Sequence, residues 1–297
     1  MQTVLLTGAN GFVSWYLIRQ LLTQDYHIIA TGKGPSRLPF ESEKLVYESL
    51  DFTNENDIKE IFNKHKPQIV VHAGAISKPD ECELNKEQAY NTNVQSTKFL
   101  IAAAAKCKSY FLFVSTDFVF DGNSLEYIEA EQNLKPVNYY GETKKLAEEA
   151  VQDYAFDWSI VRTILVYGKP MSGRQNMLTV VANALQKGEP LKIFSDQTRK
   201  PTYVEDLANA MAVLIEKKQT GIFHIAGVDV LTPYEMAVAV AVHLGYDPAI
   251  IESVTAETFK QPAKRPPTTG FDLMKAKREL FYNPISFAEG LKKTFAD

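Results

Sequence analysis

Short apolar segments alternate with amphipathic stretches along the first half of the chain. The segments with strand character are residues 4–7, 27–31, 45–48, 68–73, 109–115 and 158–162. The stretches with helical spacing are residues 12–22, 56–63, 87–105 and 139–154. Strands that are apolar throughout need helices on both faces, and this alternation is typical of βαβ units. The pattern therefore predicts an α/β fold built on a doubly wound parallel sheet.

The pattern changes after residue 162, where the loops between elements become longer. The elements predicted there are a loop at 167–174, a helix ending at 187, a strand at 191–194, a helix after 203, a strand at 222–225, helices from 232, a loop at 260–270 and a final helix. We expect residues 1–166 and 195–228 to form the domain that contains the sheet. Residues 167–194 and 229–297 are predicted to form a smaller C-terminal lobe that binds the substrate.

The overall composition argues against several classes of protein. Of 297 residues, 45% are hydrophobic and 23% are charged, as in an average globular protein. The formal net charge is −4 and there is no basic run, so we expect no nucleic-acid partner. Without a charged leader or an apolar run long enough to span a bilayer, the chain is expected in the cytoplasm and not at a membrane. Cys82 and Cys107 form no CxxC pair and the five histidines are scattered, so we expect no bound metal.

A glycine-containing turn lies between the first predicted strand and the first predicted helix. Gly8 permits a tight turn there, and Gly11 lets a ligand approach the backbone without meeting a Cβ atom. In a parallel sheet this turn presents the amides of a helix N-terminus to a pyrophosphate. Its position therefore predicts a Rossmann-type site for NAD(P). The predicted contacts are Gly8, Asn10, Gly11, Phe12 and Val13.

The residues after the second and third strands bear on which dinucleotide binds. The second strand ends without the acidic residue that would hold the ribose 2′-hydroxyl of NAD. Lys33 and Arg37 are placed to pair with a 2′-phosphate, which favours NADP, with NAD possible; the alternative is that both are ordinary solvated cations. Asp51 and Phe52 follow the third strand, where Asp51 is predicted to accept a hydrogen bond from the adenine amine, unless it is an exposed turn residue.

Tyr140 and Lys144 are four residues apart, so their side chains lie on one face of a predicted helix. A phenol has an ordinary pKa of about 10, and a nearby ammonium group lowers it by favouring the phenolate. Thr116 follows the fifth predicted strand, at the edge where ligands bind in such sheets. We therefore predict an acid–base centre in which Tyr140 protonates a carbonyl oxygen and Thr116 hydrogen-bonds to it.

Further motifs accompany these residues. The complete set lies at residues 7–12, 50–53, 72–75, 93–94, 115–122, 140–144, 162–163, 166–168, 196–197, 201–202 and 265–266. With these motifs the chain resembles the extended short-chain dehydrogenases/reductases, and within them the dTDP-4-dehydrorhamnose reductases, over nearly its whole length. The segment Ser-Thr-Asp-Phe-Val-Phe-Asp-Gly at 115–122 and the pair Arg265-Pro266 are the more specific to that family.

This resemblance implies an enzyme that reduces a nucleotide-linked 4-keto-6-deoxy sugar with NADPH. Hydride would go to the C4 ketone, Tyr140 would supply the proton, and Lys144 would bind the nicotinamide ribose. The cofactor would also contact Ala73, Gly74 and Ala75. The implied substrate contacts are Thr116, Asp117 and Phe118 near the sugar, and Asn176, Arg199 and Arg265 near the diphosphate. A homodimer is compatible with the resemblance.

Two positions depart from the family pattern. The family usually has a tyrosine where this chain has Phe118, and its rhamnose-forming members have a tryptophan where it has Leu165. Both differences argue against dTDP-4-dehydrorhamnose as the natural substrate. A nucleotide-sugar 4,6-dehydratase would need an Asp-Glu pair after Thr116, but here Asp117 is followed by phenylalanine. Two alternatives stay open: a nucleotide-sugar 4-epimerase that retains NAD, and a non-catalytic regulatory subunit similar to the methionine adenosyltransferase β subunit.

Overall fold

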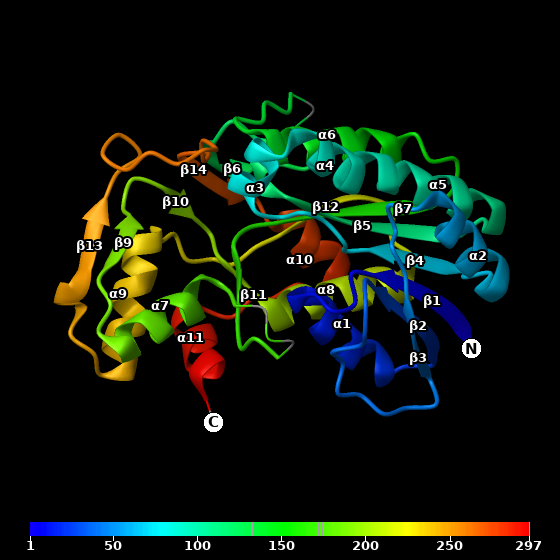
Figure 1. Cartoon of the computed structure of the whole chain (residues 1–297), viewed down its shortest axis with the longest axis horizontal. Coiled ribbons are helices and arrows are strands. Elements are labelled where there is room, and N and C mark those ends of the chain that lie inside the picture. The colour runs from blue at the N-terminus through cyan, green and yellow to red at the C-terminus, as the bar shows by residue number, and fades with distance from the viewer. Residues whose placement is uncertain (132, 172, 174, 297) are drawn as a thin grey trace.

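A seven-stranded parallel sheet forms the centre of the computed structural model, which describes residues 1–131, 133–171, 173 and 175–296 (Figure 1). The strand order is β12 (Gly221–Ile225), β7 (Trp158–Thr163), β5 (Tyr110–Thr116), β4 (Ile69–His72), β1 (Gln2–Thr7), β2 (Tyr26–Gly32) and β3 (Leu45–Ser49). All neighbouring strands run parallel. The direction of the order reverses between β1 and β4, so ligands are expected at the carboxyl ends of these two strands. The predicted doubly wound α/β fold is confirmed.

Helices cover both faces of the sheet (Figure 1). One face carries α2 (Glu55–His65), α5 (Ser96–Cys107) and α6 (Tyr139–Gln152); the other carries α1 (Phe12–Leu22), α8 (Val204–Lys217) and α10 (Met274–Leu280). Because successive strand residues point to opposite faces, Leu5 packs in the core under α2 and α5, whereas Val4 and Leu6 pack in the core under α1 and α8. The strands are apolar throughout because both of their faces are buried.

The second lobe lies to the left of the sheet in Figure 1. Its elements are α7 (Met177–Lys187), β9 (Leu191–Phe194), α9 (Pro233–Leu244), a 3₁₀ turn at Pro248–Ile250, β13 (Ile251–Val254) and α11 (Phe287–Phe295). Strands β9 and β13 pair in parallel, and α7 packs against α9. Leu178 and Met236 of this lobe belong to the same apolar core as Leu6, so the core is continuous between the two lobes.

Two smaller sheets join segments that are distant in the sequence. Strand β14 (Thr268–Phe271) lies between β10 (Thr198–Arg199) and β6 (Asn123–Tyr127), and β8 (Val166–Tyr167) pairs with β11 (Thr202–Tyr203). Strand β14 and helix α10 fall inside the range predicted for the second lobe, yet they pack against β6 and β12. The chain therefore returns from the second lobe to the sheet domain before its last helix.

The structure corrects several predicted elements. The expected loop at 260–270 ends in β14, while β6 and α3 (Pro79–Leu84) were not predicted. The expected helix at 87–105 is divided into α4 (Lys86–Tyr90), a π turn at Asn91–Gln95 and α5. Within this turn the side-chain amide of Asn93 donates hydrogen bonds to the carbonyl of Ile76 and to the hydroxyl of Thr143. Such buried polar contacts favour the irregular turn.

Residues 172 and 174 of the predicted loop at 167–174 lie outside the described part of the chain. Among the residues that are described, no helix combines the length and the apolar character needed to cross a bilayer.

Candidate active site

The glycine turn between β1 and α1 is shaped for close approach. Gly8 has a φ of +72°, and a Cβ atom there would lie 2.8 Å from the Cα atom of Gly74. The turn is closed by the Gly11 amide, which donates to the Gly8 carbonyl over 2.8 Å. Helix α1 begins at Phe12 with no side chain capping its N-terminus. A helix start with free first-turn amides beside a cradle without Cβ atoms fits the pyrophosphate of a dinucleotide.

A cleft of about 470 Å³ adjoins the glycine turn. It is lined by Lys33, Leu50, Asp51, Phe52, Thr53, Ile76, Glu87, Gln88, Asn91 and Thr92. Gly74 lies directly beneath the Phe52 ring, since a Cβ atom at Gly74 would come within 2.6 Å of it. The size of the cleft and its apolar floor both suit a planar base. Asp51, Phe52 and Gly74 are among the residues that the sequence predicted for the cofactor, with Asp51 predicted at the adenine.

The cations predicted to select NADP lie at the mouth of this cleft and beside the glycine turn. The exposed Lys33 ammonium is 2.8 Å from Oδ2 of Asp51, and this hydrogen bond holds the pKa of Asp51 at about 2. The Arg37 guanidinium donates to the Asn10 carbonyl over 3.2 Å, and its backbone amide donates to the Asn10 side chain. Asn10 also donates to the hydroxyl of Tyr47, so it fastens the loop after β2 to the glycine turn.

Helix α6 places Tyr140 at the carboxyl end of β5. The side chain of Asn138 accepts a hydrogen bond from the Gly141 amide and so caps the helix. Any Cβ atom at Gly141 would lie 2.1 Å from the carbonyl oxygen of Phe118, so only glycine lets the helix start this close to the strand. The Tyr140 ring is 9% exposed and packs edge-on against the Phe118 ring, with ring centres 5.7 Å apart. Only a small part of Tyr140 is therefore in contact with solvent.

Lys144 lies one helical turn after Tyr140 and is buried. Its ammonium donates to the carbonyl of Val114 over 2.7 Å and lies 3.8 Å from the centre of the Phe113 ring. Burial lowers the pKa of Lys144 to about 7, against the opposing effect of Glu148. A lysine with this pKa exchanges its proton near neutral pH, which suits a group that adjusts the pKa of a neighbouring phenol.

The lowered pKa of Lys144 makes a testable prediction about stability. Between pH 7 and about 10.4 the unfolded chain binds a proton at Lys144 that the folded chain does not, so the stability rises with pH across this window. We therefore expect the free energy of unfolding of the wild type, minus that of Lys144→Met, to increase with pH across this window. The increase should be at most roughly 1.4 kcal/mol per pH unit. Urea unfolding of both proteins at several pH values measures this difference. All other titratable groups are shared, so a difference that stays constant with pH would contradict the prediction.

Thr116 ends strand β5 and caps the 3₁₀ turn Asp117–Val119. Its hydroxyl accepts from the Phe118 amide over 3.3 Å and donates to the Asp117 carboxylate over 3.1 Å. Asp117 is 1% exposed, with an ion pair to Arg199 and a hydrogen bond from Thr269. The structure thus places Thr116 at the carboxyl end of β5, as predicted, and it gives Asp117 and Arg199 partners inside the protein.

The other two residues predicted to contact a diphosphate also have internal partners. Asn176 is the N-cap of α7, where its side chain accepts from the Leu178 amide and donates to the Gly168 carbonyl over 2.6 Å. Arg265 forms a two-point ion pair with Asp80, at 2.5 and 2.8 Å. Their roles as diphosphate contacts stay predictions, since these partners show how each side chain is held and not what it meets in a complex.

Sequence reasoning missed three groups that organise the site. Asp80 holds Arg265, Thr269 donates to Asp117, and Glu148 pairs with Arg162 behind Lys144. Only Glu148 had a signal in the sequence, because it lies four residues after Lys144 on the same helix face. Asp80 and Thr269 act across 185 and 152 residues respectively, distances over which no local pattern is informative.

Comparisons with known proteins agree with this geometry. The family model described as the RmlD substrate binding domain matches residues 1–297. The Spore coat polysaccharide biosynthesis protein SpsK of Bacillus subtilis is 29% identical over 90% of this chain and 87% of its own. Methionine adenosyltransferase 2 subunit beta of Pongo abelii is 30% identical over 80% of this chain and 71% of its own.

A solved structure extends the comparison to three dimensions. The dTDP-4-dehydrorhamnose reductase of Bacillus anthracis, in complex with NADP, is 26% identical, has a TM-score of 0.86, and is matched over 99% of this chain and 98% of its own. The chain therefore belongs to the RmlD substrate binding domain family, among the extended short-chain dehydrogenases/reductases similar to dTDP-4-dehydrorhamnose reductase.

Proposed function

We propose that this chain is an NADPH-dependent reductase of a nucleotide-linked 4-keto-6-deoxy sugar. The observation that carries the proposal is the placement of Tyr140 and Lys144 of α6 beside the carboxyl end of β5, the strand that Thr116 terminates. The glycine turn and the uncapped N-terminus of α1, which suit a dinucleotide, lie at the end of β1, two strands away in the same sheet. Acid–base groups beside a dinucleotide site are what the reduction of a carbonyl requires.

Each side chain has a definite task in this reaction. Tyr140 donates its phenolic proton to the carbonyl oxygen. Thr116 orients that oxygen by donating to it its single hydroxyl proton, which Asp117 accepts when no substrate is bound. The Lys144 ammonium stabilises the phenolate that forms, while the Val114 carbonyl keeps the ammonium directed toward the strand end. The nicotinamide dinucleotide supplies the hydride when it is bound. Phe118 and Cys82 keep the Tyr140 ring in an apolar cluster, which limits water around the reacting proton.

The cofactor is NADP, with NAD a possible substitute. Arg37 lies against the backbone of the glycine turn and Lys33 at the mouth of the adjoining cleft, where a 2′-phosphate would attach. Asp51 already holds Lys33, so Arg37 is the stronger candidate for the phosphate. The NADP bound to the solved Bacillus anthracis relative supports this choice.

The sugar is expected to differ from that of the rhamnose-forming relatives. Phe118 places an apolar ring edge beside Tyr140, where a tyrosine would offer a hydroxyl. Leu165 is 36% exposed and holds a left-handed backbone with a φ of +35°, a conformation that non-glycine residues adopt mainly where the surroundings require it. Two hydrogen-bonding or stacking positions are thus apolar, which favours a less hydroxylated sugar.

Turnover of a panel of nucleotide-linked 4-keto sugars tests the proposal. We expect loss of reduced-cofactor absorbance with at least one sugar, and faster turnover with NADPH than with NADH. If none of the sugars oxidises NADPH, the proposed reductase activity is contradicted. Tightly bound NAD in the purified protein would then indicate a 4-epimerase, and a co-purified protein partner without ketone reduction would indicate a regulatory subunit.

A further inference from the structure

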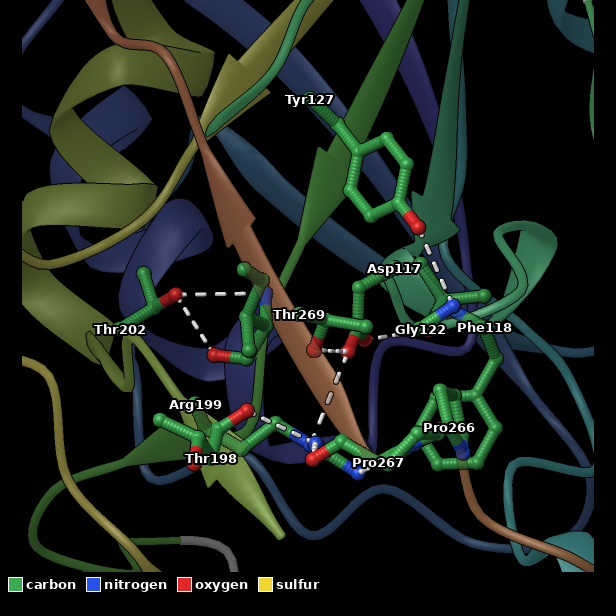
Figure 2. Close-up of polar contacts among 12 residues, drawn as sticks. Asp117, Phe118, Gly122, Tyr127, Thr198, Arg199, Thr202, Pro266, Pro267 and Thr269 are labelled. Atoms are coloured by element: carbon green, nitrogen blue, oxygen red, sulfur yellow. Dashed lines mark hydrogen bonds and ion pairs between the residues drawn. The ribbon is translucent and has the colours of Figure 1, made fainter. Parts of the chain in front are cut away.

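A buried carboxylate lies directly behind the catalytic threonine. The two oxygens of Asp117 accept hydrogen bonds from different side chains: Oδ1 from Thr116 at 3.1 Å and Oδ2 from Thr269 at 2.5 Å. The Nε atom of Arg199 lies 3.9 Å from Oδ2 (Figure 2). Thr269 is fully buried and Arg199 is 4% exposed, so these contacts are shielded from solvent. We call Asp117, Thr116, Arg199 and Thr269 the Asp117 network.

Arg199 connects this network to the segment before β14. Its guanidinium donates to the carbonyls of Thr198, Pro267 and Pro266 at 2.8, 3.2 and 2.5 Å, and all three lie around it in Figure 2. Its backbone amide and carbonyl also pair with Leu231. One side chain therefore pairs with the aspartate that follows β5 and donates to three carbonyls, one on its own strand β10 and two in the segment before β14.

The segments joined in this way carry the predicted substrate contacts. Pro266 and Pro267 pack against Gly122, where an added Cβ atom would come within 2.6 Å of both rings. The adjacent Arg265 reaches Asp80 on α3. On the other side, Thr116 holds the Phe118 amide next to Tyr140. Arg199 therefore contacts both the carboxylate that accepts from Thr116 and the segment that carries Arg265.

The charges of Asp117 and Arg199 depend on each other. Burial raises the pKa of Asp117, and the charge of Arg199 is the main influence that opposes the rise. Burial likewise lowers the pKa of Arg199, opposed by the charge of Asp117. Each charge therefore depends on the other, and loss of one would leave the other without compensation in the interior.

We propose that Asp117 and Arg199 are a positioning pair that sets the place of the Thr116 hydroxyl relative to the 265–267 segment. The pair acts through Thr116 and does not touch the sugar nucleotide, which differs from the substrate contacts predicted for both residues from the sequence. The inference rests on the proposed reductase function, because the quantity that the pair controls is the orientation of the carbonyl being reduced. Thr269 contributes to this positioning, because its hydroxyl donates to the second oxygen of Asp117.

Variants of Thr269 test the pair with little disturbance. Thr269→Val removes the hydrogen bond to Asp117 and keeps the shape, whereas Thr269→Ser keeps the hydroxyl. We expect Thr269→Val to lower kcat about tenfold, the effect of one hydrogen bond to a charged group, with KM for the sugar nucleotide nearly unchanged. Thr269→Ser should restore kcat. The matched control is Thr294→Val, a buried threonine that donates to Gly290 within α11 and should leave kcat unchanged.

Arg199→Met separates positioning from diphosphate binding. A positioning role predicts a lower kcat at nearly constant KM, whereas a diphosphate ligand predicts a higher KM. Equal kcat in Thr269→Val and Thr269→Ser, or an Arg199→Met effect confined to KM, would overturn the proposal.

Hydrogen exchange supplies a readout that needs no turnover. The Thr268 amide donates to the Gly122 carbonyl and the Thr198 amide to the Pro267 carbonyl, so both report on the joined segments. We expect amides in residues 265–271 to exchange at least about tenfold faster in Thr269→Val and Arg199→Met than in the wild type, Thr269→Ser and Thr294→Val. Unchanged exchange would overturn the positioning role. A wild type that reduces no sugar but shows this pattern would contradict the proposed function alone.

Discussion

Replacing Tyr140 by phenylalanine is expected to lower kcat by about 100- to 10,000-fold, the usual contribution of a positioned acid. The substitution removes one oxygen atom from a side chain that is 9% exposed and leaves its edge-on contact with Phe118 in place. Fold and cofactor affinity should therefore stay close to those of the wild type. Single-turnover oxidation of NADPH in the presence of the reactive sugar measures the chemical step directly.

The neighbouring tyrosine provides a matched control for this prediction. Tyr139 undergoes the same chemical change in Tyr139→Phe, but its ring lies 5.2 Å from the Lys86 ammonium and its position on the helix does not face Lys144. We expect Tyr139→Phe to keep nearly full activity. Similar losses in the two variants, or a Tyr140→Phe enzyme that keeps more than about a tenth of the wild-type rate, would show that Tyr140 is not the acid.

The parts of the fold that the sequence predicted are those set by local periodicity. Helix α1 has the predicted bounds, and the six sheet strands of the first half lie within two residues of the predicted ends. These elements bury a continuous apolar face, and that face is visible in the sequence as a repeating pattern. By contrast, β6, β10 and β14 are short and polar at several positions, and they gain their stability from pairing with each other. No repeat in the sequence marks such strands.

The same distinction holds for the candidate site. Tyr140 and Lys144 were predictable because one helix carries both, and Gly8 and Gly11 because one turn carries both. Arg199 was predicted at a diphosphate because an arginine on a loop suits an anion. The structure gives it a buried aspartate and three carbonyls, partners contributed by segments up to 82 residues away (Asp117). Burial and these internal partners are not visible in the sequence, and the role of Arg199 at a diphosphate stays a prediction.

Breaking the buried ion pair behind Lys144 should destabilise the protein more than most single substitutions do. Glu148 is fully buried and Arg162 is 1% exposed, and they form hydrogen bonds of 3.1, 3.2 and 2.6 Å. Glu148 also accepts from the Ser115 hydroxyl, and Arg162 lies 3.3 Å from the Nε2 atom of His224. Removal of either charge would leave the other in the interior without compensation.

We expect Glu148→Gln and Arg162→Met each to lower the free energy of unfolding by about 3–5 kcal/mol, as broken buried pairs do. The double variant should lose clearly less than the sum of the single losses, because it leaves no unpaired charge. Urea unfolding of the wild type, the two single variants and the double variant completes the cycle. The control is Glu205→Gln in the exposed pair with Arg19, at a cost of no more than about 1 kcal/mol. Additive losses across the cycle would mean that the two groups are stabilised independently, with Ser115 and His224 as the partners that matter.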